Sequence, residues 1–180
     1  MRIISGSLKG RRLKSPTWEG LRPTSDKLRE TLFNILAPRI AGARVLDGYA
    51  GTGALGIEAI SRGAAMVTFA DSDTRAHALI AANLAHCGVT NGYAIIRAPV
   101  ARAIDDFRPA SLDIILLDPP YDDVQVDRVI ETAGEVLAPD GVLVLEHARR
   151  RPTPPTSGSL VRVRQVISGD SALSFYSWPH

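Results

Sequence analysis

The chain has 180 residues, of which 45% are hydrophobic, with a formal net charge of +2 and one cysteine. This length allows one sizeable core and is too short for two, so we expect a single soluble domain over residues 1–180. Because Cys87 has no partner for a disulfide and no apolar run is long enough to span a bilayer, we expect a cytoplasmic protein without a membrane role.

The first 23 residues are predicted to form a small extension, with a β-hairpin over Arg2–Leu13 and a loop over Pro16–Pro23. Five basic residues and no acidic residue precede Thr17, and a second basic cluster spans Arg149–Arg151. Clusters of one sign attract polyanions such as nucleic acid, although a basic cluster by itself is more often a solvated face.

The core is predicted to begin at residue 24 with a helix over Asp26–Leu36, in which leucines recur every four residues. From Ala43 onward, short apolar runs alternate with stretches of helical period, which is typical of a parallel sheet with crossover helices. The expected strands are Arg44–Asp47, Met66–Asp71, Ala94–Arg97, Leu112–Leu117 and Gly141–Glu146. The expected helices are Ala54–Arg62, Thr74–His86, a short one near Val100–Phe107, and Gln125–Leu137, which ends at Pro139-Asp140-Gly141.

The last part of the chain is predicted to be an antiparallel hairpin. The segment Pro152–Ser159 is rich in proline, serine and threonine and is expected to be only a turn-rich connection. Two strand-like runs follow, Leu160–Ile167 and Ala172–Trp178, and they are expected to close the sheet.

A glycine-rich segment follows the first strand of the predicted sheet. Gly51, Gly53 and Gly56 fit the pattern G-x-G-x-x-G between a strand and a helix, and Asp71 lies about 20 residues further on. Such glycines let the backbone approach a ligand, and an acid at that distance accepts hydrogen bonds from ribose hydroxyls. The pattern predicts a nucleoside-containing ligand, whereas the glycines alone would indicate a tight turn.

The acid at the end of the first strand indicates which nucleoside is bound. Asp47 would repel a buried pyrophosphate, whereas it would attract the cationic amino-acid end of S-adenosylmethionine. The stretch Asp47-Gly48-Tyr49-Ala50-Gly51-Thr52-Gly53 resembles the first motif of Rossmann-like methyltransferases. The resemblance implies an α/β fold with a seven-stranded sheet, helices on both faces and an antiparallel last strand. It also implies S-adenosylmethionine as the cofactor, Asp71 on its ribose, Ser72 beside its adenine, and backbone groups of Ala98 and Val100 near that ring.

The fourth strand ends in the tetrad Asp118-Pro119-Pro120-Tyr121. Neither proline can continue a sheet, so the chain must turn there with fixed geometry. The Asp118 carboxylate and the Pro119 carbonyl are candidates to accept hydrogen bonds from an amine while it attacks a methyl group, and Tyr121 to stack on a base. An Asp-Pro turn alone is common, but the whole tetrad resembles the amine-methylating motif of nucleic-acid methyltransferases.

A narrower resemblance covers nearly the whole chain. The segments RIISGSLKGRRL, LRPTSDKLRETLFNIL, GALGIEAISRGA, DPPY and GDSALSFY are similar to the bacterial 16S ribosomal RNA guanine-N2 methyltransferases, the RsmD-like proteins. The resemblance implies that Lys9, Arg11 and Arg12 contact ribosomal RNA and that Arg22-Pro23-Thr24 folds over the amino-acid end of the cofactor. It places methylation on one guanine of the small-subunit RNA, in a partly assembled 30S particle, and we expect the enzyme to be a monomer.

Three other functions stay open at this point. The tetrad does not distinguish guanine from adenine or cytosine amines, so a DNA amino-methyltransferase is one alternative, although no separate target-recognition domain is apparent. An NAD(P)-binding oxidoreductase would use the same glycines but lacks an obvious proton donor. A non-catalytic RNA-binding module is the third. We expect no metal site, and His77, His86 and His147 are assigned to ordinary helix or strand surfaces.

Overall fold

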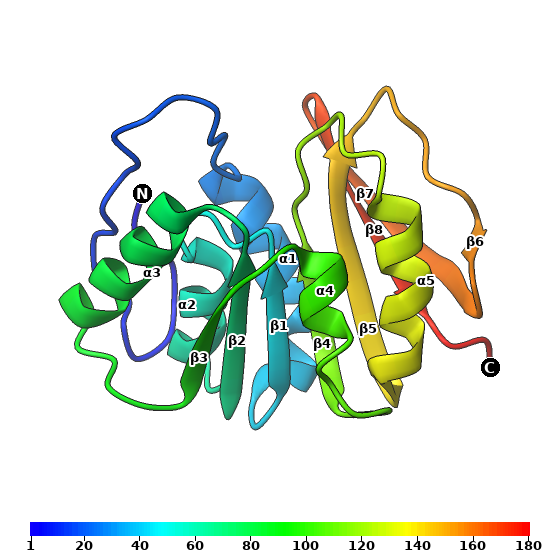
Figure 1. Cartoon of the computed structure of the whole chain (residues 1–180), viewed down its shortest axis with the longest axis horizontal. Coiled ribbons are helices and arrows are strands. Elements are labelled where there is room, and N and C mark those ends of the chain that lie inside the picture. The colour runs from blue at the N-terminus through cyan, green and yellow to red at the C-terminus, as the bar shows by residue number, and fades with distance from the viewer.

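The computed structural model describes all 180 residues and contains one eight-stranded sheet, which runs through the whole molecule (Figure 1). Its strands are β1 Arg44–Gly48, β2 Met66–Asp71, β3 Tyr93–Arg97, β4 Leu112–Leu117, β5 Leu137–Ala148, β6 Thr156–Ser157, β7 Leu160–Ser168 and β8 Ser171–Ser177. They follow the spatial order β3-β2-β1-β4-β5-β8-β7-β6. The first five strands are parallel, and β8 is antiparallel to both of its neighbours, β5 and β7.

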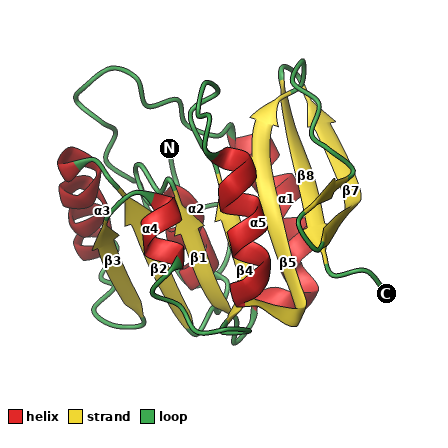
Figure 2. Ribbon diagram, turned by 45° about the vertical axis from the view of Figure 1, so that its right-hand side comes forward, coloured by secondary structure: helices red, strands yellow, loops and turns green.

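Helices cover both faces of this sheet, as Figure 2 shows. They are α1 Asp26–Ile40, α2 Ala54–Ser61, α3 Thr74–His86, α4 Val100–Ile104 and α5 Val126–Val136. One buried cluster joins α1, α2 and α3 to one face, and a second joins α4 and α5 to the other. The alternation of strands and helices in the sequence therefore gives the predicted Rossmann-like arrangement. All five helices are too short or too polar to span a bilayer.

The sheet has one more strand than the seven expected. The extra strand, β6, lies inside the segment predicted only to turn, and its two residues pair with Leu160 and Val161 of β7. Gly158 adopts a φ of +57° in the two-residue loop between β6 and β7, which is the conformation that tight hairpin turns require. The Ser-Gly-Ser sequence was thus a hairpin signal, masked by the neighbouring prolines.

Several helix ends differ from their predictions: α2 ends at Ser61 rather than Arg62, α4 ends at Ile104 rather than Phe107, and α1 and α5 differ as follows. Helix α1 continues past Leu36 to Ile40 despite Pro38, because Ile40 extends the buried four-residue repeat. Helix α5 ends at Val136, and β5 begins at once with Leu137 in an extended conformation. Gly141 therefore does not cap α5, and its φ is not positive. A Cβ there would lie 2.6 Å from the Leu137 side chain, so close packing explains the glycine.

The N-terminal segment forms less of a hairpin than expected but is firmly attached. Its only β-bridge joins Arg2 to Arg12, while Ile3 and Leu13 are buried in the same core cluster as α1 and α2. The buried Glu58 carboxylate of α2 accepts hydrogen bonds from the backbone N–H groups of Ile4 and Ser5, at 2.9 and 3.0 Å. The segment is therefore held in one orientation against the sheet.

Candidate active site

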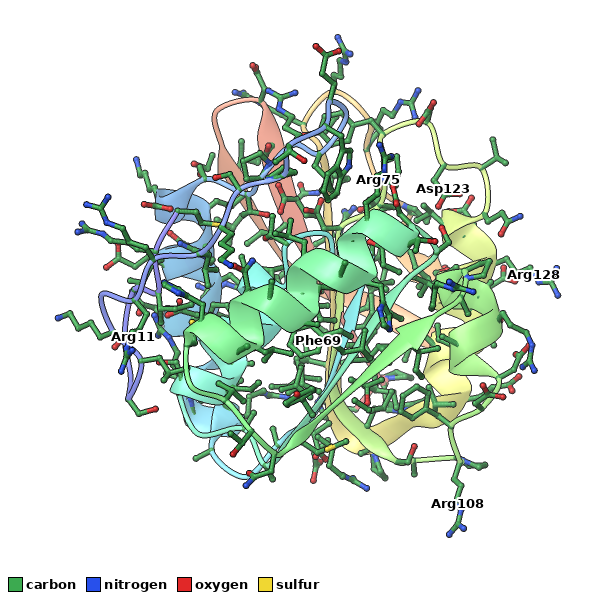
Figure 3. All side chains as sticks on the ribbon, turned by 60° about the vertical axis from the view of Figure 1, so that its left-hand side comes forward. Arg11, Phe69, Arg75, Arg108, Asp123 and Arg128 are labelled. Atoms are coloured by element: carbon green, nitrogen blue, oxygen red, sulfur yellow. The ribbon has the colours of Figure 1, made fainter.

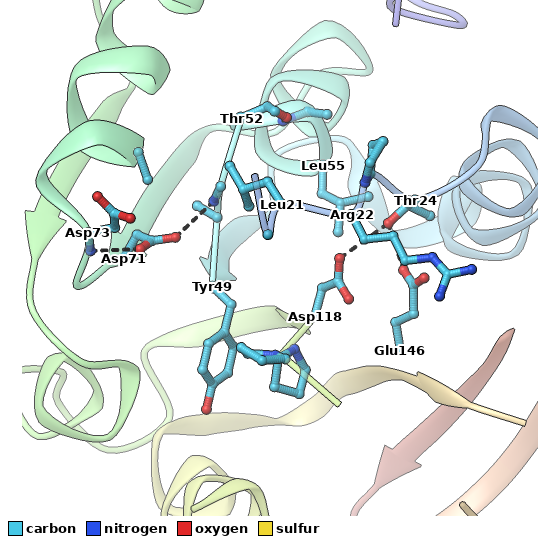
Figure 4. A pocket seen from close by; sticks show the side chains of 18 of the residues that line it. Leu21, Arg22, Thr24, Tyr49, Thr52, Leu55, Asp71, Asp73, Asp118 and Glu146 are labelled. Carbon is cyan, nitrogen blue, oxygen red and sulfur yellow. Dashed lines mark hydrogen bonds between the residues drawn. The ribbon is translucent and has the colours of Figure 1, made fainter. Parts of the chain in front are cut away.

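A cavity of about 1400 Å³ opens at the carboxyl ends of β1, β2, β4 and β5 (Figure 4). The crevice beyond the carboxyl ends of parallel strands is where open α/β sheets bind their ligands. Pockets for a single drug-sized ligand occupy about 300–1,000 Å³, so this cavity has room for more than one such group. A donor molecule and part of a second substrate therefore fit in it together.

The loop after β1 contributes its backbone to the cavity. Gly51 and Gly53 have φ angles of +57° and +80°, which side chains with a Cβ rarely adopt. The Asp71 carboxylate accepts hydrogen bonds from the N–H groups of Gly51 and Asp73, at 3.0 and 2.9 Å. Asp71 thus fixes the loop at the position where a ribose-binding acid is expected.

Asp47 lies at the base of the same loop with 1% of its surface exposed. Its Oδ2 accepts a hydrogen bond of 2.9 Å from the N–H of Gly56, in the first turn of α2, so the strand-end acid also caps a helix that has no side-chain cap of its own. Burial, and to a lesser degree the nearby Asp71 carboxylate, raise the pKa of Asp47 to about 8, against the lowering effect of the Gly56 N–H. A cationic ligand group near Asp47 would favour its charged form.

The predicted turn after β4 places Asp118 in the cavity, next to a second carboxylate. The Thr24 hydroxyl donates a hydrogen bond of 2.6 Å to Oε2 of Glu146 and lies 3.4 Å from Oδ2 of Asp118 (Figure 4). Burial raises the pKa of Asp118 well above its ordinary value, as do the neighbouring charges of Glu146 and Asp47. Burial also raises the pKa of Glu146, opposed by Thr24 and Arg22.

Several groups hold Tyr121 and the turn in place. The guanidinium of Arg22 lies 5.8 Å from the centroid of the Tyr121 ring, within cation–π range. The Tyr121 hydroxyl forms a hydrogen bond of 3.3 Å with Ser171, and Arg151 donates to the Tyr121 carbonyl. Tyr49, which also lines the cavity, has a φ of 60°, which is uncommon for a residue other than glycine.

Most of the predicted ligand-binding residues line the cavity. Those that do are Thr24, Asp47, Tyr49, Ala50, Gly51, Asp71, Ser72, Val100 and the tetrad Asp118, Pro119, Pro120, Tyr121. Gly48, Gly53 and Ala98 do not. A Cβ on Gly48 would lie 2.7 Å from the Leu117 side chain, Gly53 is the N-cap of α2 and lies near Ile80 and Phe69, and the N–H of Ala98 donates to the Asp71 carbonyl. These three residues therefore lie behind the residues that line the cavity.

Glu146 also lines the cavity, although no sequence motif predicted it. Glu146 follows the apolar run of β5, just as Asp47 and Asp118 lie at the ends of their own apolar strands. An acid at the carboxyl end of a buried parallel strand was therefore the signal that would have found it. The assignment of His147 to a surface was also wrong, because its ring is buried and forms a hydrogen bond of 2.8 Å with Ser174.

The charge of the cavity selects among nucleoside ligands. Nine acidic side chains line it, but only two basic ones, Arg22 and Arg75. An acidic cavity opposes a pyrophosphate and suits a donor that carries an ammonium and a sulfonium group. The lining therefore fits S-adenosylmethionine and argues against NAD(P).

The predicted RNA-binding residues lie on the N-terminal segment, outside the cavity. Lys9, Arg11 and Arg12 are exposed and form no ion pair with an acidic side chain. Figure 3 shows Arg11 pointing into solvent, well away from Arg75 and Asp123, which line the cavity. Their positive charge is available to an external polyanion.

Comparisons with known proteins give a consistent result. The family model described as Conserved hypothetical protein 95 matches residues 1–177. The chain is 35% identical over 180 residues to Ribosomal RNA small subunit methyltransferase D of Escherichia coli, covering 98% of this chain and 89% of that protein. It is 38% identical to YlbH of Bacillus subtilis, with 98% of each covered. The solved structure of yhhF from Escherichia coli superposes with a TM-score of 0.85 at 32% identity, covering 98% of this chain and 96% of that one.

Proposed function

We propose that this chain, which belongs to the Conserved hypothetical protein 95 family, methylates the exocyclic amine of a guanine in small-subunit ribosomal RNA with S-adenosylmethionine as the methyl donor. The relatives named Ribosomal RNA small subunit methyltransferase D, in Escherichia coli and other bacteria, support this activity. The single observation in the chain that carries the proposal is the position of Asp118, on a two-proline turn inside a cavity large enough for a donor and a base.

The donor supplies an electrophilic methyl group on its sulfonium. The guanine amine is a poor nucleophile, because its lone pair is delocalised into the ring. We assign Asp118 and the Pro119 carbonyl to accept hydrogen bonds from the two amine hydrogens, so that the nitrogen lone pair turns toward the methyl carbon. The N–C bond forms as the S–C bond breaks, and the Asp118 carboxylate accepts the amine proton, which its raised pKa favours.

Other residues of the cavity are assigned to the cofactor and to the base. Asp71 and Ser72 are assigned to the ribose and adenine side of the donor, and Asp47 with Thr24 to its amino-acid end. Tyr121 is assigned to stack on the flipped guanine, since aromatic side chains stack on unpaired bases. Arg22 would then cover the entrance of the cavity above Tyr121, and its position over the Tyr121 ring supports this assignment.

The proposed RNA contacts lie on the N-terminal extension, residues 1–23, next to a catalytic core of residues 24–180. Lys9, Arg11 and Arg12 would neutralise phosphates while the base enters the acidic cavity, which separates binding of the backbone from chemistry on the base. A cytoplasmic monomer that acts on a partly assembled 30S particle is the working hypothesis for the substrate.

The test is methylation of small-subunit particles and of naked RNA with labelled donor, followed by digestion to nucleosides. The expected label is in N2-methylguanosine, and label in N6-methyladenosine would refute the proposal. Asp118→Ala is expected to abolish turnover and largely spare donor affinity, which calorimetry measures, whereas Asp127→Ala on the exposed surface of α5 should keep both. Full activity of Asp118→Ala would remove it from the mechanism. Calorimetry with NAD tests the oxidoreductase alternative, and DNA in the same labelling assay tests the DNA alternative.

A further inference from the structure

Glu146 lines the cavity beside Asp118, but the proposed methyl transfer gives it no role. Leu117 of β4 pairs with Leu145 of β5, so Asp118 and Glu146 are the next residues on two neighbouring parallel strands. Side chains at matched positions of parallel strands point to the same face of the sheet. Glu146 is 7% exposed and lines the cavity together with Asp118.

The hydrogen bonding leaves one oxygen of Glu146 unused. The Thr24 hydroxyl has one proton and gives it to Oε2 of Glu146, at 2.6 Å. No donor of the protein contacts Oε1. Oε1 is not fully enclosed by the protein, so it faces the cavity, where a ligand that brings a donor can pair with it.

Arg22 favours the charged form of this side chain. Its positive charge lowers the pKa of Glu146, against the burial that raises it, and its guanidinium stands over the Tyr121 ring, where the base is proposed to stack. The ligand expected beside Glu146 therefore presents an N–H donor adjacent to the amine held by Asp118.

Guanine has this arrangement and adenine does not. On the Watson–Crick edge of guanine the N1–H donor lies next to the 2-amino group, whereas adenine has an N1 lone pair next to its amine. Enzymes that extrude a base read it through hydrogen bonds to this edge. A carboxylate facing the adenine N1 would meet a lone pair, lose its hydrogen bond and stay buried without a donor.

We propose that Glu146 accepts the N1–H of the flipped guanine through Oε1 and so selects guanine over adenine. This inference rests on the proposed function, and it divides the work between two neighbouring acids. Asp118 holds the reacting amine, Glu146 reads the ring nitrogen beside it, and Thr24 holds the Glu146 carboxylate in the orientation that leaves Oε1 free.

The test uses 2-aminopurine, which keeps the 2-amino group but has a lone pair at N1. The methylated guanine is first mapped with wild-type protein, and small-subunit RNA is then prepared with guanine or 2-aminopurine at that position. The wild-type protein is expected to prefer guanine by about a hundredfold or more in kcat/KM, because the analogue leaves a buried acid unpaired. In Glu146→Gln the preference should fall to within about tenfold, since the amide N–H can donate to the N1 lone pair.

Matched variants separate recognition from folding. Glu135→Gln makes the same change on the exposed face of α5 and should keep the full preference for guanine. Glu146→Asp keeps the charge and should keep the preference at a lower rate. Thermal unfolding and donor affinity, measured on each variant, report whether the site is intact.

The outcomes distinguish the two proposals. Equal wild-type rates on the two RNAs, or an unchanged preference in Glu146→Gln, would refute the role of Glu146 and leave the proposed function standing. Failure of the wild-type protein to methylate any guanine of the RNA would refute both.

Discussion

The Asp47 carboxylate should make the protein less stable as the pH rises. Burial raises its pKa in the folded protein from the ordinary 3.8 to about 8, so between these two values the folded chain holds a proton that the unfolded chain has lost. Holding that proton costs free energy as protons become scarce, and the slope is about 1.36 kcal/mol per pH unit. Over the range from about pH 5 to about pH 8 this amounts to roughly 4 kcal/mol of lost stability.

Asp47→Asn removes this dependence while keeping an oxygen to accept the Gly56 N–H. The free energy of unfolding of the variant differs from that of the wild type by two contributions. One is a constant that does not vary with pH, because asparagine does not titrate, and the other is the pH-dependent contribution of Asp47. The free energy of unfolding of the variant minus that of the wild type should therefore grow by roughly 4 kcal/mol from about pH 5 to about pH 8. Urea unfolding at several pH values, followed by circular dichroism, measures this difference directly.

A matched control has the opposite sign of shift. The ion pair and hydrogen bonds with Arg44 lower the pKa of Asp113, so its contribution to stability changes only as the pH falls below its ordinary range. The difference between Asp113→Asn and the wild type should thus be constant above about pH 5. If the Asp47→Asn difference is equally constant, Asp47 is ionised throughout and the reasoning about its burial is wrong.

Three further predictions test other parts of the structure. Binding of S-adenosylmethionine should release protons, because its positive charges favour the charged forms of Asp47 and Asp118. Its affinity should therefore rise with pH up to about 8. Calorimetry in buffers of different ionisation enthalpy measures the proton release, and would show none if the donor binds elsewhere. Gly56→Ala places a Cβ 2.3 Å from the Phe69 ring and should destabilise the fold by about 1–3 kcal/mol, whereas Gly134→Ala, with 3.5 Å to its nearest neighbour, should be neutral or stabilising in the same urea titration. Replacing Arg11 and Arg12 with alanine should weaken RNA binding and make its salt dependence shallower by about 1–2 in the log–log slope, while an exposed arginine elsewhere on the surface should have no such effect.

The sequence predicted most of the fold because its signals were local. Each parallel strand is a short apolar run and each helix between them has the helical period, so the order of elements indicates a parallel sheet with right-handed crossover connections. The predicted helix ends were wrong where a tertiary contact outweighed a local sequence signal. Helix α1 was expected to end at Leu36, but the buried side chain of Ile40 holds a further turn despite Pro38, and Gly141 was expected to follow the end of α5 although packing against Leu137 accounts for it.

The candidate site was partly visible for the same reason. Asp47 and Asp118 were predicted because each lies at the end of an apolar strand and belongs to a motif. Glu146 also lies at the end of an apolar run, but the residues around it form no recognised motif. Its partner Thr24 lies 122 residues away in the chain, and no spacing rule connects them.

The order of the strands in the sheet explains why the acids of the cavity lie close together. Because β4 lies between β1 and β5, the carboxyl ends of three consecutive strands in space bring Asp47, Asp118 and Glu146 to one crevice. Burial raises the pKa of all three acids, and the charges of Glu146 and Asp47 repel that of Asp118 and raise its pKa further, so the charged forms are costly when no ligand is bound. A donor with two positive charges and a base edge with several N–H groups relieve that repulsion. The same strand order that strains the empty cavity therefore explains why it should select a cationic cofactor and a base rich in donors.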